Sequence, residues 1–493
     1  MRRGSLPIAR HLFAPLLLLA ACCQFAWAAP YEIQNDIEQI IRDGQVGATE
    51  ISVTVLDPVT GDMLAAVDDD RRMIPASNMK LLTSGATLIT LGADFNFRTV
   101  VAWLPGDGGG KLVVRGDGDP AFGDPELLLE QDLGIEDFLG AIVEAVKAEG
   151  ITEIGELVID DRIFDDERIH ASWPLDQLNR WYCAEVSGLN FHTNIINVFA
   201  RPGEAGRPPA ITLEPSAPWL NIVNGARSVT KGSHTAWVAR DLKSNRMTLK
   251  GDIRWASDPV EVAVHDPAMF FAEVLAHRLG SAGVRPRHIR RAEPGDILPS
   301  GRPVLVIETP LEVVMRRCNF DSYNLYAEAM LKRIGFAVTG MPGSWRNGAA
   351  VVRLVMLEHL GASTSDEIVV ADGSGMSREN RVTTRMLARW LKVLLEQDPA
   401  VRDAFIESLA TTGRDGTLRK RFREVDLDND IHAKTGYLTG VTALSGYLVQ
   451  PGTQRTVIFS IVTNNKPSRV PLANVRLTEE RIVKRVDRWL NGE

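Results

Sequence analysis

The sequence is poor in cysteine, with four among 493 residues. Two of these lie in the apolar N-terminal segment, which leaves Cys183 and Cys318 for the rest of the chain. There is no C-x-x-C pair and no H-E-x-x-H motif, and the nine histidines are scattered. We therefore expect no metal and no cofactor. A disulfide between Cys183 and Cys318 and two separate buried thiols both stay open, and a distant pair in a large protein favours the thiols.

The chain also has no excess of positive charge, since its formal net charge is -8 and its pI is about 5.7. This argues against a nucleic-acid partner, because phosphate binding needs a basic face. No low-complexity tract and no repeat of fixed period occurs, which excludes solenoids. The remaining composition, 45% hydrophobic and 24% charged, is that of a globular protein. The length predicts two or three domains.

The N-terminus has the composition of a secretory signal peptide, predicted over residues 1–28. Three arginines among the first ten residues precede the apolar residues 12–21, and A-W-A at residues 26–28 fits a cleavage site. The apolar run is short for a membrane span. Cleavage would remove three arginines and no acid, so the mature charge would be -8 - 3 = -11. We expect secretion across the cytoplasmic membrane, into the periplasm or cell envelope.

A second interpretation of this segment is a lipoprotein signal. The stretch L-A-A-C that ends at Cys22 fits a lipidation site, and lipidated Cys22 would be a membrane anchor. Apolar sequence continues past Cys22, whereas lipoprotein linkers are usually polar. Simple cleavage near Ala28 is therefore favoured.

Two ends of the chain carry the clearest secondary-structure patterns. Residues 50–67 form two apolar runs around D-P-V-T-G-D and predict a β-hairpin. Residues 431–464 predict three strands. Helices are predicted at about 78–91, 322–334, 348–359, 383–396 and 477–491. Strands at both ends with helices between them predict one α/β domain, an antiparallel sheet flanked by helices, that is closed by the two termini.

The middle of the chain has a different sequence pattern. From about 98 to 300, short strand-like runs alternate with Gly, Asp and Pro, and two helical runs interrupt them near 135–149 and 267–283. We expect a discontinuous domain of residues 31–97 and 300–493, with residues 98–299 inserted as one or two smaller β-rich domains.

A serine and a lysine stand one helical turn apart at the start of the helix predicted at 78–91. In I-P-A-S-N-M-K, Ser77 and Lys80 have the i, i+3 spacing that places two side chains on one helix face. A serine needs a base to become a nucleophile, and a lysine of lowered pKa can serve. Alone, Ser77 is better explained as a plain helix cap, and Ser228 and Lys231 show the same spacing without a helical run.

Two further motifs change the interpretation. Ser322-Tyr323-Asn324 opens a predicted helix, and Lys434-Thr435-Gly436 ends a predicted strand. Each alone would be a helix cap or a strand end. S-x-x-K, S-x-N and K-T-G in this order are typical of penicillin-binding proteins and class A β-lactamases.

The chain resembles the D-alanyl-D-alanine carboxypeptidase/endopeptidase family of low-molecular-mass class C penicillin-binding proteins, the S13 serine peptidases. The first two motifs are 322 - 77 = 245 residues apart, a gap similar to the long insertion of this family. Other matching stretches are G-D-G-D-P at 116–120, D-G-S-G-M-S-R at 372–378 and G-R-D-G-T-L at 413–418. The resemblance covers nearly the whole mature chain and implies a penicillin-binding transpeptidase-like fold.

The resemblance implies a role for each motif residue. Ser77 would be the acylated nucleophile and Lys80 its general base. Ser322 would relay a proton to the leaving amine, and Asn324 would hold Lys80 and the substrate amide.

The third motif would bind the substrate's end. Lys434 and Thr435 of Lys434-Thr435-Gly436 would clamp the terminal carboxylate, which a cation and a hydroxyl suit on chemical grounds. Backbone N–H groups of Ser77 and Tyr437 would form the oxyanion hole. Tyr323 stands where aspartate is common, and Tyr437 replaces a serine or threonine that often follows K-T-G, which puts the substrate preference in doubt.

The implied substrates are peptidoglycan stem peptides that end in D-alanine or are cross-linked through it, and β-lactams would be covalent inhibitors. A β-lactamase shares the motifs, but we find no segment for the class A deacylating glutamate. A Ser-His-Asp esterase is disfavoured because G-x-S-x-G is missing. A wall-binding module without turnover is the other alternative. The balance of carboxypeptidase and endopeptidase action, the third stem residue and the oligomeric state stay open.

Overall fold

The computed structural model describes residues 33–298, 301–413, 416–453 and 455–493. The N-terminal arginines, the cleavage site and Cys22 lie outside these residues, so the signal peptide and the lipid anchor stay predictions. Among the described residues, no helix has both the length and the apolar character that a membrane span requires.

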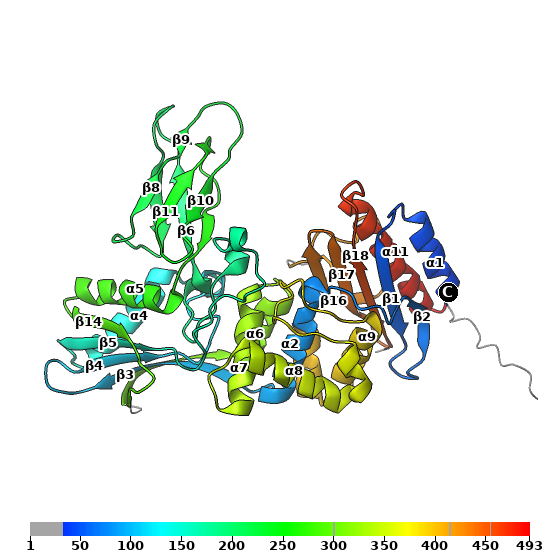
Figure 1. Cartoon of the computed structure of the whole chain (residues 1–493), viewed down its shortest axis with the longest axis horizontal. Coiled ribbons are helices and arrows are strands. Elements are labelled where there is room, and N and C mark those ends of the chain that lie inside the picture. The colour runs from blue at the N-terminus through cyan, green and yellow to red at the C-terminus, as the bar shows by residue number, and fades with distance from the viewer. Residues whose placement is uncertain (1–32, 299–300, 414–415, 454) are drawn as a thin grey trace, which may run out of the picture.

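One antiparallel sheet joins the two ends of the chain (Figure 1). Its strands are, in order, β16 (Asp430–Leu438), β17 (Val441–Val449), β18 (Thr456–Asn464), β1 (Glu50–Leu56) and β2 (Met63–Val67). β1 pairs with β18 from Glu50 opposite Asn464 to Leu56 opposite Ile458. The predicted hairpin and the three predicted strands are therefore confirmed, and they share one sheet.

Helices cover both faces of this sheet, as Figure 1 shows. On one face α1 (Gln34–Asp43) and α11 (Leu472–Leu490) pack against apolar side chains of the sheet. The other face lies against a helical layer with its own core. This layer contains α2 (Met79–Leu91), α6 (Leu311–Asn319), α7 (Asn324–Thr339), α8 (Trp345–Leu360), α9 (Thr384–Leu395) and α10 (Pro399–Glu407). Sheet and helices leave β16 at an edge, beside the start of α2.

The middle of the chain folds around a second sheet, of order β14-β5-β4-β3-β15. Its strands are β14 (Pro286–Arg291), β5 (Ile154–Asp160), β4 (Lys111–Arg115), β3 (Asn96–Leu104) and β15 (Arg302–Pro310), and its main helices are α4 (Ile135–Ala148) and α5 (Pro267–Ser281). Neighbours β14, β5 and β4 are parallel, so this part is a mixed α/β layer. α4 and α5 correspond to the helical runs predicted near 135–149 and 267–283, and the region is rich in strands, as predicted.

Smaller sheets extend from this layer (Figure 1). They contain β6 (Ile195–Arg201), β7 (Ala210–Glu214), β8 (Ile222–Asn224), β9 (Arg227–Ser228), β10 (Trp237–Arg240), β11 (Met247–Lys250), β12 (Asp252–Ile253) and β13 (Val260–Ala263). Apolar residues of these sheets and of the α/β layer form one continuous core.

The chain enters and leaves this middle region through two paired strands. β3 and β15 lie antiparallel, with Asn96 opposite Pro310. We therefore propose that the inserted region runs from the start of β3 to the end of β15, slightly wider than the predicted 98–299. Its continuous core favours one inserted domain rather than two.

The two cysteines within the described residues are free thiols. Cys183 and Cys318 are both buried and unbridged, as favoured from the sequence.

Candidate active site

Ser77 lies in a single 3₁₀ turn, Ala76–Asn78, that leads directly into α2. The turn is fixed from two sides. Asn78 is buried and donates from Nδ2 to Ser445 Oγ of β17 at 2.7 Å. Ala76 has a φ of 46°, a region that costs a non-glycine residue about 1–3 kcal/mol and persists where the surroundings impose it. Ser77 itself is half-buried, so its hydroxyl can be reached from outside.

Lys80 is fully buried behind Ser77, on the first turn of α2. Its Nζ lies 3.1 Å from Ser77 Oγ, 2.6 Å from Asn324 Oδ1 and 3.0 Å from the carbonyl oxygen of Ser374. The i, i+3 spacing therefore brings Ser77 and Lys80 into hydrogen-bond contact. The motif residue Asn324 joins them from the first turn of α7.

Burial lowers the pKa of Lys80 to about 8. Loss of hydration disfavours the ammonium form, while Cys318, Glu328 and Asp372 act in the opposite direction. At a pKa of about 8, about one lysine in ten is neutral at pH 7, against about one in three thousand at the ordinary value. A neutral amine beside a serine hydroxyl can accept its proton.

The D-G-S-G loop forms the back wall of this site. Ser374 bonds to Lys80 through its carbonyl oxygen. A Cβ at Gly375, which has a φ of 84°, would lie 1.8 Å from the carbonyl oxygen of Ala76. The loop therefore packs directly under the Ser77 turn, and only glycine fits at Gly375.

Two buried carboxylates hold this loop in place. Glu328 accepts from the backbone N–H groups of Gly373 and Ser374, at 2.9 and 2.8 Å, and Asp372 accepts from that of Gly375 at 2.9 Å. Burial, reinforced by the charge of Asp372, raises the pKa of Glu328 to about 7. These groups fix the Ser374 carbonyl that Lys80 contacts.

The middle of the chain contributes to the site as well. Asn324 donates from Nδ2 to the backbone oxygen of Tyr182 at 2.8 Å, across 142 residues of sequence. Tyr182 belongs to a short 3₁₀ turn, Trp181–Cys183. Asn324 therefore connects Lys80, through Oδ1, to the middle of the chain, through Nδ2.

Ser322 stands just before α7 in a left-handed conformation with a φ of 67°. Its hydroxyl makes no hydrogen bond to any described residue, and it is not among the contacts of Lys80. The structure thus joins Ser77, Lys80 and Asn324, while the role predicted for Ser322 stays a prediction.

Lys434 is fully buried on β16, and its Nζ donates to the carbonyl oxygen of Thr435 at 3.0 Å. Burial lowers its pKa well below the ordinary value, and the nearby charge of Lys80 lowers it further. A buried cation without a carboxylate partner is unfavourable, so an incoming carboxylate would raise this pKa again.

Gly436 allows β16 to approach the backbone of Ser77. A Cβ at Gly436 would lie 3.0 Å from the carbonyl oxygen of Pro75 and 3.1 Å from the backbone nitrogen of Ser77. Along the strand, Thr435 is half-buried and Tyr437 is 54% exposed. The K-T-G strand therefore runs directly beside the backbone of Ser77.

Comparisons with known proteins show which family this chain belongs to. The model of the D-Ala-D-Ala carboxypeptidase 3 (S13) family matches residues 33–485. The chain belongs to this family. It is 32% identical to a D-alanyl-D-alanine carboxypeptidase of Actinomadura sp. (strain R39), over 93% of this chain and 86% of the relative. It is 23% identical to the D-alanyl-D-alanine carboxypeptidase DacB of Haemophilus influenzae, over 81% of this chain and 84% of the relative.

A solved structure shows the same fold. Penicillin-binding protein 4 (dacB) of Haemophilus influenzae superposes with a TM-score of 0.74 at 21% identity, covering 92% of this chain and 98% of that one. The resemblance to the S13 family and the predicted transpeptidase-like fold are confirmed.

Two features set this S13 chain apart from the common motif pattern. The ring of Tyr323 packs against Trp181, with centroids 5.0 Å apart, and under the guanidinium of Arg317 at 4.8 Å. It faces these groups rather than Lys80, so the missing aspartate leaves the contacts of Lys80 intact. Tyr437 lies under Arg476 at 5.9 Å.

Sequence reasoning missed several groups around Lys80. Glu328 follows Asn324 by one helical turn on α7, so the i, i+4 spacing was a usable signal. The D-G-S-G stretch matches the family, but the sequence does not indicate its contact to Lys80. Tyr182 carried no signal, because its contribution is a backbone oxygen.

Proposed function

We propose that this S13 chain is a serine-type D-alanyl-D-alanine carboxypeptidase, endopeptidase or both, which acts on peptidoglycan peptides through an acyl-enzyme on Ser77. One observation carries the proposal: a buried lysine of lowered pKa, Lys80, lies 3.1 Å from the half-buried hydroxyl of Ser77. The names of the relatives support the substrate class.

In the acylation step, Lys80 takes the proton of Ser77 as Oγ attacks the carbonyl carbon of the penultimate D-alanine. The backbone N–H groups of Ser77 and Tyr437 stabilise the oxyanion. The C–N bond then breaks, the leaving amine receives the proton from Lys80 through Ser322, and the acyl group stays on Ser77. Attack by water releases the product and restores the serine.

Lys434 and Thr435 bind the carboxylate of the leaving D-alanine in this proposal. A charge-assisted contact of this kind contributes about 2–3 kcal/mol, or about 30- to 150-fold. Lys434→Ala should therefore reduce kcat/KM for peptides ending in free D-Ala-D-Ala far more than for the same peptides with an amidated C-terminus. The measurement is the ratio of the two kcat/KM values in wild type and variant. An unchanged ratio would show that Lys434 does not bind the carboxylate.

The pKa of Lys80 sets the expected pH dependence. The base works only when neutral, so the acylation rate should rise about tenfold per pH unit from about pH 6 and level off above about pH 8. The rate is measured at saturating fluorescent penicillin, so that binding by Lys434 does not contribute. Circular dichroism at each pH controls for unfolding. A flat profile from about pH 6 to about pH 9 would contradict Lys80 as the base.

Labelled penicillin separates the alternatives. A lasting covalent adduct supports a penicillin-binding peptidase, rapid turnover a β-lactamase, and no adduct a wall-binding protein. Incubation with monomeric and cross-linked muropeptides, analysed by mass, measures the balance of carboxypeptidase and endopeptidase action. The proposed substrate and the predicted signal peptide together place the enzyme in the periplasm or cell envelope.

A further inference from the structure

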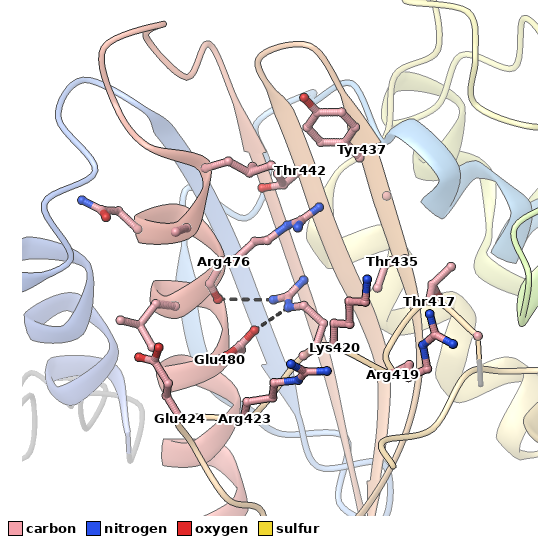
Figure 2. A pocket seen from close by; sticks show the side chains of 17 residues that line it. Thr417, Arg419, Lys420, Arg423, Glu424, Thr435, Tyr437, Thr442, Arg476 and Glu480 are labelled. Atoms are coloured by element: carbon pink, nitrogen blue, oxygen red, sulfur yellow. Dashed lines mark hydrogen bonds and ion pairs between the residues drawn. The ribbon is translucent and has the colours of Figure 1, made fainter. Parts of the chain in front are cut away.

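A groove begins at the K-T-G strand and leads away from the catalytic residues. Figure 2 shows it over β16, between α11 and residues 416–424. Its volume is about 760 Å³, and Thr435, Gly436 and Tyr437 form its inner edge. Thr435 and Gly436 therefore line the groove and also belong to the proposed carboxylate site.

The lining of the groove is cationic, in contrast to the negative chain as a whole. Five arginine or lysine side chains and two glutamates line it. Arg421 is paired with Glu480 and with Glu479 at the base of the groove. Lys420 and Arg423 are exposed and form no ion pair with a described residue.

Further cations extend toward the strand. Arg476 reaches from α11 over the ring of Tyr437, and Lys420 extends over β16 from the opposite side (Figure 2). Neither pairs with an acid among the described residues. The groove therefore presents several positive charges to whatever lies beyond Thr435.

The position of the groove identifies which part of a substrate would enter it. In the proposed function, Lys434 and Thr435 hold the carboxylate of the residue that leaves. A groove that starts at Thr435 thus continues on the side of the leaving group. A single D-alanine has one carboxylate, which Lys434 already binds, whereas a second stem peptide released from a cross-link carries more carboxylates further out.

We propose that this groove binds the leaving part of the peptide and selects leaving parts with carboxylates beyond the one next to the cleaved bond. Cross-linked peptides with an acidic leaving strand should then be better substrates than binding of one carboxylate by Lys434 alone would make them. The inference rests on the proposed function and names the substrate class of the same site.

The test uses two synthetic substrates with the same D-alanyl acyl part. One releases a tripeptide with two extra carboxylates, and the other releases the same tripeptide with those carboxylates amidated. The wild type should have the higher kcat/KM on the acidic form. In the variant Lys420→Glu/Arg423→Glu this preference should fall on the order of tenfold. In wild type, added salt should also weaken it, because exposed charges are screened.

A matched control carries the same charge change elsewhere. Lys243→Glu/Arg207→Glu alters exposed residues of the inserted region and should retain the wild-type preference. Penicillin acylation of each variant reports on the Ser77 site and on folding. If Lys420→Glu/Arg423→Glu is acylated normally and still prefers the acidic substrate, the role proposed for the groove is refuted and the proposed function is unaffected. A wild type that acylates penicillin and cleaves neither peptide overturns the proposed function instead.

Discussion

Replacing Ser77 by alanine is expected to abolish both penicillin labelling and peptide cleavage, a loss of about 10⁴-fold or more in rate. The acyl-enzyme cannot form without Oγ, and no other group of the site can replace it. The change should leave the fold intact, because Ser77 is half-buried and its Oγ has only Lys80 as a hydrogen-bond partner among the described residues. Fluorescent penicillin on a gel, cleavage assays and thermal melting provide the measurements.

Ser228 is the internal control for this result, because Lys231 follows it with the same spacing. The structure gives Ser228 a different environment: it is buried on β9, and its Oγ accepts from the backbone N–H of Gly203 at 3.0 Å. Penicillin should label the variant Ser228→Ala to the same extent as the wild type. Mass mapping of the penicillin-treated wild type should place the adduct on Ser77, and an adduct on Ser228 would refute the assignment.

Replacing Lys80 by arginine is expected to slow acylation by about 10³-fold or more. Arginine keeps the positive charge but stays protonated at any usable pH, so it cannot accept the proton of Ser77. The measurement is the rate of acylation by labelled penicillin at saturation. Acylation of the variant at nearly the wild-type rate would exclude Lys80 as the base.

Lys80 is completely buried, so the larger guanidinium could also disturb packing. Lys80→Met serves as the companion variant, because it removes the amine while keeping a long unbranched side chain. It leaves the oxygens of Asn324 and Ser374 without their partner, and we expect a lower melting temperature. Slow acylation in both variants, each shown to be folded by its melting curve, identifies the missing base as the cause.

The sequence predicts the contact of Ser77 and Lys80 because the two share one helical turn, where spacing alone determines proximity. It predicts Asn324 and Lys434 only through the ordered motifs, since nothing local indicates that either side chain faces α2. The sequence cannot predict the contacts of the Ser374 and Tyr182 carbonyl oxygens. Backbone oxygens belong to every residue, and their positions depend on long-range packing.

The boundaries of the proposed inserted region are also only partly predictable from the sequence. The sequence predicts a change of texture near residue 98, and the structure places β3 from Asn96 and β15 up to Pro310 in the same sheet. Pairing between strands so distant in sequence leaves no local signature. α1 and α6 were also not predicted.

The pairing of β1 with β18 means that the sheet beside the active site is built from strands far apart in the chain. The chain is made from its N-terminus, so Ser77 and Lys80 emerge early, whereas β16, β17 and β18 emerge within the last part of the chain. The sheet through β3 and β15 can close before that, since both strands precede residue 311. Contacts between distant segments form late in folding. A chain that already contains Ser77 and Lys80 therefore stays unable to be acylated until β16 has paired with β17 beside them.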